Sequence, residues 1–113
     1  MPKPTKGRSR DKRRTTVRPP QADRERILAI QENRCIYCNN EFDSFIERGD
    51  DLEPVVLSWD HFLPFAYTQS NEVSNLFAAC RACNSIKGNL IYESIEDAVR
   101  AICKRRWEKG YRL

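Results

Sequence analysis

Four cysteines, spaced as two pairs, are the residues of this 113-residue chain whose types and spacing most clearly indicate chemistry: Cys35 and Cys38, then Cys80 and Cys83. Thiolate sulfur is a soft ligand, and four thiolates in a tetrahedron suit Zn²⁺. A gap of two residues lets both thiols of one turn reach the same ion. Because four thiolates leave no position for water, we expect a structural zinc site. The alternative is four free cysteines that pack as small apolar residues.

The cellular setting also favours metal over disulfides. The chain has five cysteines, so any pairing leaves one over, and Cys103 is the natural remainder, expected as a buried and inert thiol. The N-terminus lacks the apolar segment of a secretory signal, and no apolar run approaches the roughly 20 residues that span a bilayer. We therefore expect an intracellular, cytoplasmic protein of prokaryotic or phage origin, in which thiols stay reduced.

A second set of residues has the types needed for hydrolysis. A phosphodiester is anionic and has a poor leaving group, so its catalyst needs a base for water and a cation for the developing charge. The single histidine, His61, suits the base, because imidazole is largely neutral at pH 7. Asp60 and Asn84 offer the hard oxygens that Mg²⁺ prefers. Neighbours on a strand point to opposite faces, so these roles require the strand to end near Asp60 and His61.

Local patterns predict the elements that position these residues. We expect helices at about 21–33, at 81–88 ending at Gly88, and from a Ser94 cap to Gly110, with strands at 55–59 and 74–79. The acidic segment 41–53 and residues 62–73 are predicted as loops. The last helix has an apolar stripe at helical spacing, formed by Ile95, Ala98, Val99, Ile102, Cys103 and Trp107. Its basic run, Lys104-Arg105-Arg106, is predicted to face solvent or to follow a DNA backbone.

The positive charge of the protein is concentrated in its first 20 residues. This segment has eight Lys or Arg and one Asp, so its net charge is +7. The remaining residues have a net charge of −3, which gives the whole chain a net charge of +4. With four prolines and few apolar residues, residues 1–20 are predicted to be a disordered basic tail, followed by one domain at 21–113. Such a tail suits a polyanion such as DNA, and the alternative is a tail that only aids solubility.

The joint pattern resembles the HNH endonuclease family, the ββα-metal nucleases, in the subgroup with four cysteines. The matching residues are Cys35-x2-Cys38, Asp60-His61-x2-Pro64, Asn75-Leu76-x3-Cys80-x2-Cys83-Asn84 and Lys87. The resemblance implies a small α+β fold, a two-stranded hairpin and a helix around a zinc, with flanking helices. It implies that His61 is the general base, that Asp60 and Asn84 bind one Mg²⁺ or Mn²⁺, and that Asn75 holds the hairpin loop so that His61 is aimed.

Further expectations and departures accompany this resemblance. Lys87 would contact phosphate or remain a solvated lysine. The last family position is often histidine and is Asn84 here, which favours an oxygen-ligated ion. The loop at 65–73 lacks the glycines often seen there, and Asn71 is a rival to Asn75. The expected partner is DNA, with a homodimer or a larger protein supplying specificity. The alternatives are a zinc-stapled nucleic-acid adaptor without its own nuclease activity and a structural zinc domain that docks a protein.

Overall fold

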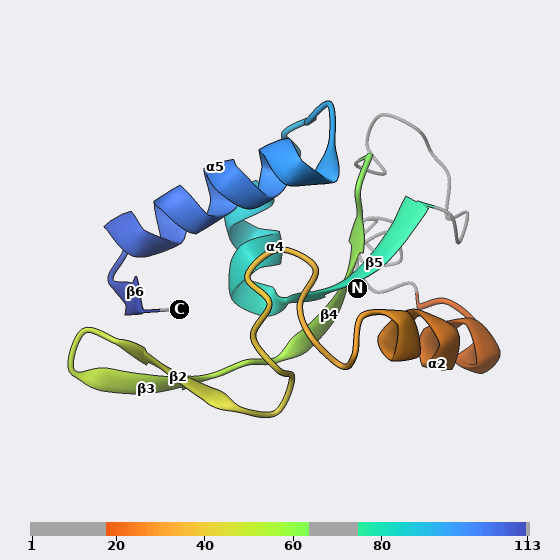
Figure 1. The fold of residues 1–113 in the computed structure, drawn as a ribbon, viewed down its shortest axis with the longest axis horizontal. Helices are drawn as coiled ribbons and strands as arrows, with labels where there is room; N and C mark the ends of the chain where they lie inside the picture. The colour runs from red at the N-terminus through yellow and green to blue at the C-terminus, as the bar shows by residue number, and fades with distance from the viewer. Residues whose placement is uncertain (1–17, 64–74, 113) are drawn as a thin grey trace, which may run out of the picture.

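The computed structural model describes residues 18–63 and 75–112, which form helices and two small antiparallel sheets (Figure 1). The predicted α+β class is therefore confirmed. Most of the tail predicted at 1–20, namely residues 1–17, lies outside the described residues. The same is true of residues 64–73 of the loop predicted at 62–73. The elements are α2 (Gln21–Ile30), β2 (Phe45–Arg48), β3 (Asp51–Pro54), β4 (Leu57–His61), β5 (Leu76–Cys80), α4 (Arg81–Lys87), α5 (Ile95–Glu108) and β6 (Tyr111–Arg112).

The centre of the fold is the antiparallel pair β4 and β5, followed directly by α4. Leu57 pairs with Cys80 at one end of the hairpin and His61 pairs with Leu76 at the other. Gly88 ends α4 at φ 56°, a left-handed conformation that favours glycine. Both strands lie about two residues later than the sequence predicted. Consequently Asp60 and His61 are within β4, whereas they were expected at the end of a strand over 55–59.

Two further helices flank this unit. In α2 the buried residue is Ile27, and Arg24 donates from Nη1 to the carbonyl of Pro19 at 2.8 Å. Pro19 is itself buried. The predicted Ser94 cap of α5 is confirmed, because its hydroxyl accepts from the Asp97 backbone N–H at 3.1 Å. Such a cap satisfies one of the donors that a helix leaves free at its first turn.

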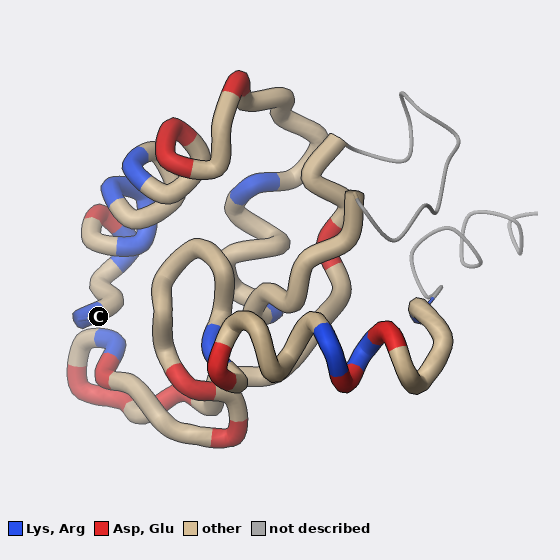
Figure 2. The backbone as a smooth tube through the Cα atoms, turned by 45° about the vertical axis from the view of Figure 1, so that its right-hand side comes forward, with Lys and Arg blue, Asp and Glu red and all other residues tan. Residues whose placement is uncertain are grey.

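Two predictions about which residues of α5 are buried and which face solvent are wrong. Ala98 and Ile102 are buried as the apolar stripe requires, but Trp107 is 61% exposed. Arg106, predicted to lie on the solvent side, is completely buried. The other two residues of the basic run, Lys104 and Arg105, are exposed. Figure 2 shows blue Lys and Arg segments along this helix.

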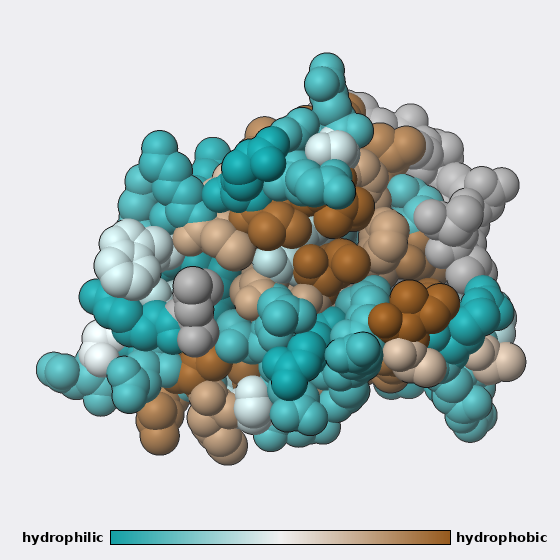
Figure 3. All heavy atoms as spheres, viewed as in Figure 1, coloured by the Kyte–Doolittle hydropathy of each residue, from teal (hydrophilic) through white to brown (hydrophobic). Residues whose placement is uncertain are grey.

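The acidic segment 41–53 is largely a β-hairpin rather than the predicted loop. β2 and β3 pair antiparallel, and β6 joins the other edge of β2. The turn has two residues, Gly49 and Asp50, and Gly49 has the positive φ of 60° that suits a type II′ turn. Phe45 and Leu52 are exposed apolar side chains of this hairpin. Figure 3 shows brown and tan surface at the lower left, where Figure 1 places β2 and β3.

The core lies where the β4–β5 pair, the cysteine turn and α5 meet. Its fully enclosed members include Ala78 and Ala79 of β5 and Ala98 and Ile102 of α5. Small residues in β5 let the cysteine turn and the helices approach the sheet closely. Among the described residues, no helix has the length and apolar character to cross a membrane.

Candidate functional site

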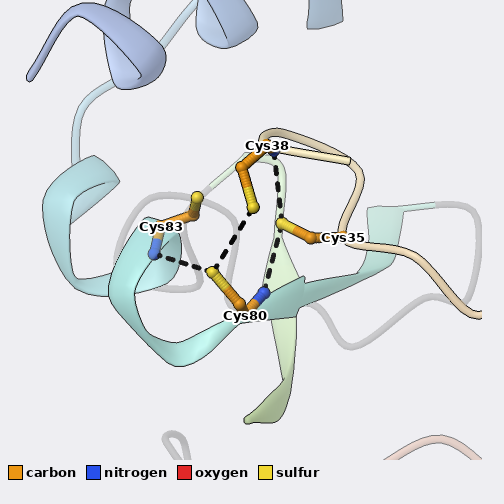
Figure 4. A group of neighbouring side chains, drawn as sticks. All are labelled: Cys35, Cys38, Cys80 and Cys83. Atoms are coloured by element: carbon orange, nitrogen blue, oxygen red, sulfur yellow. Dashed lines mark hydrogen bonds between the residues drawn. The ribbon is translucent and has the colours of Figure 1, made fainter. Parts of the chain in front are cut away.

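The four paired cysteines converge on one point. Cys35 and Cys38 come from the turn after α2, Cys80 ends β5 and Cys83 lies in the first turn of α4, and the side chains point toward one another (Figure 4). Their sulfur atoms all lie within 4.8 Å of one another, and the four residues are buried. Because Cys35–Cys38 and Cys80–Cys83 are far apart in sequence, a shared ligand would join the N-terminal turn to the ββα unit.

The donor set fits a tetrahedral metal ion. Four sulfurs at about 2.3 Å from a central ion are about 3.8 Å apart. The Sγ atoms of Cys38 and Cys80 are 3.8 Å apart, and all five cysteines are free of disulfides. Backbone N–H groups donate to the sulfurs, including those of Cys80 to Cys35 Sγ at 3.2 Å and of Cys83 to Cys80 Sγ at 3.4 Å. Such donors stabilise thiolate, the form that binds metal. The cluster is therefore a structural metal site of the kind that suits zinc.

Removing the metal is expected to unfold this domain. Protein purified under reducing conditions should contain about one zinc per chain by elemental analysis, and a chelator should abolish its cooperative thermal transition. Cys83→Ser should lower the zinc content, because Cys83 is completely buried in the cluster. Cys103→Ser is the matched control, since Cys103 lies outside the cluster and donates to the Tyr37 carbonyl instead. Zinc-free protein that keeps its fold would contradict this prediction.

Asp60 is buried and has two protein partners. The Tyr37 hydroxyl donates to its Oδ2, and the Lys87 ammonium lies 3.6 Å from its Oδ1. Burial raises the pKa of the Asp60 carboxyl, and the Lys87 charge and the Tyr37 hydrogen bond oppose that rise. Burial and the Asp60 charge also raise the pKa of Tyr37, so the phenol stays protonated and donates. These contacts fix the orientation of the carboxylate, which retains lone pairs for a further ligand.

Lys87 lies in the interior, although its sequence position suggested a phosphate contact or a solvated side chain. It is 0% exposed, and its Nζ donates to the His61 carbonyl at 3.0 Å. The same ammonium lies 5.9 Å from the centroid of the Phe62 ring. In this arrangement Lys87 contacts the two residues proposed for catalysis rather than solvent.

Asn84 and Asp60 share one face of β4. Ser58 and Asp60 are two residues apart on the strand, so their side chains point the same way. The Asn84 amide donates from Nδ2 to Ser58 Oγ at 3.2 Å, and Lys87, one helical turn later, reaches Asp60. α4 therefore crosses this face of the strand. Since the Asn84 amide donates through its nitrogen, its oxygen is available as an acceptor or ligand.

His61 ends β4, beside Asn75 and the start of the connecting segment. It directly follows Asp60, as the last residue of the strand. Asn75 links the two ends of this segment, because its amide accepts from the Leu63 N–H and donates to the Leu63 carbonyl, both at 2.8 Å. The Asn75 carbonyl also accepts from the Phe62 N–H at 2.9 Å. These bonds hold the backbone that directly follows His61.

The sequence did not single out three residues that contact the site: Tyr37, Ser58 and Arg106. Tyr37 lies between the first two cysteines, and its completely enclosed ring brings a hydroxyl to Asp60. Ser58 had a detectable signal, since it is two residues before Asp60 in a predicted strand. Tyr37 and Arg106 gave no such signal, because their partners are distant in sequence.

The comparison with family models agrees with this geometry. The model described as HNH endonuclease matches residues 35–90, a range that contains all four clustered cysteines and the β4–β5–α4 unit. The resemblance predicted from the motifs is thus confirmed over this range, and it indicates a nuclease-family domain that interacts with nucleic acid. No curated protein matches the chain.

Proposed function

We propose, on the premise that residues 35–90 carry an HNH endonuclease domain, that this protein is a metal-dependent endonuclease that hydrolyses DNA phosphodiester bonds. The observation that carries the proposal is the crossing of α4 over β4. It brings Asn84 to Ser58 and Lys87 to Asp60, so the carboxylate and amide oxygens share one face. His61 follows Asp60 on the same strand and is the single histidine of the chain.

His61 is proposed as the general base. Its imidazole takes a proton from the attacking water, a role that a largely neutral histidine fills near pH 7. Asn75 positions it by fixing the backbone at Phe62 and Leu63, directly after the histidine. Hydrolysis then gives a 5′-phosphate and a 3′-hydroxyl.

Asp60 and Asn84 are proposed to hold the catalytic divalent ion. An ion such as Mg²⁺ or Mn²⁺, when bound, supplies positive charge for the scissile phosphate and the leaving 3′ oxygen. Tyr37 and Lys87 orient the Asp60 carboxylate for this role, because one contacts each of its oxygens. The buried four-cysteine cluster has no open position and serves the scaffold instead.

The test is a nicking assay on supercoiled plasmid with zinc-loaded protein. Mg²⁺ or Mn²⁺ should convert the plasmid to open-circle or linear DNA, and protein with no added divalent ion should leave it intact. The reaction without added divalent ion is needed as a control in addition to a reaction with EDTA, because EDTA also removes structural zinc. Asn84→Ala should lower the rate and raise the ion concentration required for half-maximal cleavage. Asn89→Ala is a matched control, since Asn89 is an exposed asparagine after α4.

A nucleic-acid adaptor is the alternative. The buried contacts of both Asp60 oxygens favour the adaptor, because an ion at Asp60 must share the carboxylate with Tyr37 and Lys87. If zinc-loaded protein binds DNA but does not cut it with either Mg²⁺ or Mn²⁺, the result contradicts the proposed endonuclease activity and supports the adaptor.

A further inference from the structure

Arg106 of α5 is buried beside the four cysteines. Its side chain is 0% exposed, and its Nη1 lies 3.8 Å from Cys80 Sγ and 3.6 Å from Cys83 Sγ. Its Nε and Nη2 atoms are also buried, and neither has a hydrogen-bond partner within the described part of the chain. A buried guanidinium is unfavourable unless a negative charge lies close to it, because burial removes the hydration of the ion.

The described residues offer one source of that negative charge. None of the ion pairs between described residues involves Arg106. On another side, its guanidinium carbon lies 4.3 Å from the centroid of the Tyr111 ring, which attracts a cation but carries no charge. The cysteine sulfurs remain, and four thiolates around one divalent ion carry about two net negative charges.

We propose that Arg106 is an outer-sphere partner of the four-cysteine metal centre, and that its buried positive charge offsets part of the negative charge of the metal-bound thiolates. The guanidinium makes N–H···S contacts to Cys80 and Cys83, the two ligands contributed by β5 and α4. The positive charge of Arg106 is therefore coupled to the metal-binding cluster through these two contacts. This coupling goes beyond the proposed function, since it holds whether or not the protein cuts DNA.

The coupling makes the C-terminal segment part of the metal-binding unit. α5 and β6 lie outside the range that matches the HNH family, yet Arg106 and Tyr111 connect them to the cysteines. Tyr111 pairs with Arg48 of β2 and its ring also lies 4.7 Å from the Arg48 guanidinium carbon. Metal binding is therefore linked through Arg106 to the packing of α5 and, through Tyr111, to the β2–β3 hairpin.

The test compares zinc release from three variants of the full chain. Arg106→Met removes the charge and keeps a long side chain, whereas Arg106→Lys keeps the charge. Arg105→Met is the matched control, because Arg105 is the exposed neighbour on the same helix. Zinc-loaded protein is mixed with an excess of a chromophoric chelator and the release rate is followed. We expect release about tenfold faster from Arg106→Met, and rates within about twofold of wild type from the other two.

A second readout reports on the sulfur atoms directly. In cobalt-substituted protein, the thiolate-to-cobalt charge-transfer band of Arg106→Met should move to lower energy, because loss of the cation raises the energy of the sulfur electrons. Equal release rates and equal spectra for Arg106→Met and Arg106→Lys would overturn the proposal, since shape rather than charge would then matter. If neither Arg106→Met nor Arg106→Lys folds with zinc, the proposal is also overturned, because the shape of arginine rather than its charge is then required. Failure of Arg106→Met alone would support it.

Discussion

Replacing His61 with alanine is expected to lower the DNA cleavage rate by about 10³-fold, within the range that a general acid or base typically contributes. His61 is the single histidine of the chain, so no second imidazole is present to take its place. The measurement is the single-turnover rate of nicking of supercoiled plasmid in Mg²⁺ or Mn²⁺. The defect should lie in the rate at saturating protein rather than in affinity for DNA, because the base acts on water.

The controls separate chemistry from folding. Zinc content and the thermal midpoint of His61→Ala should stay close to wild type, because His61 is outside the cysteine cluster and is not fully buried. Added imidazole should restore part of the activity of His61→Ala, because a small base can occupy the vacated space. Cleavage by the variant at the wild-type rate would rule out His61 as the base. A variant that binds neither zinc nor DNA would instead assign His61 a structural role.

Local signals in the sequence predicted the elements that build the metal site. Gly88 ends α4 and Ser94 caps α5, because each effect depends on residues within one turn of the helix. The spacing of Cys35–Cys38 and of Cys80–Cys83 was sufficient to predict that they form one cluster. The α+β class followed from the same local patterns.

Contacts between residues distant in sequence were not predicted. Lys87 and Arg106 were expected at the surface, since lysine and arginine are seldom fully buried without a partner. Their burial depends on Asp60 and on the cysteine sulfurs, which only the tertiary fold brings near. The β2–β3 hairpin was missed because the acidic composition of 41–53 outweighed its Gly49-Asp50 turn signal.

Lys87→Met is expected to destabilise the protein by about 3–5 kcal/mol, the usual consequence of removing one partner from a buried ion pair. The Lys87 side chain is 0% exposed and that of Asp60 is 4% exposed, so solvent cannot replace the lost ammonium group. Methionine keeps much of the length of lysine, which limits the loss of packing. The free energy of unfolding, measured by denaturant titration of the zinc-loaded protein, checks this value. Lys109→Met is the matched control, because Lys109 is exposed at the end of α5.

A double variant distinguishes a buried ion pair from a phosphate contact. If Lys87 compensates the Asp60 charge, Asp60→Asn combined with Lys87→Met should be more stable than Lys87→Met alone, because no uncompensated carboxylate remains. If Lys87 instead binds phosphate, Lys87→Met should leave stability nearly unchanged and weaken DNA binding with a smaller salt dependence. The 3.0 Å bond from Lys87 Nζ to the His61 carbonyl adds a catalytic consequence. Because the ammonium contacts both Asp60 and the backbone of His61, its loss should lower the cleavage rate even in those molecules that remain folded.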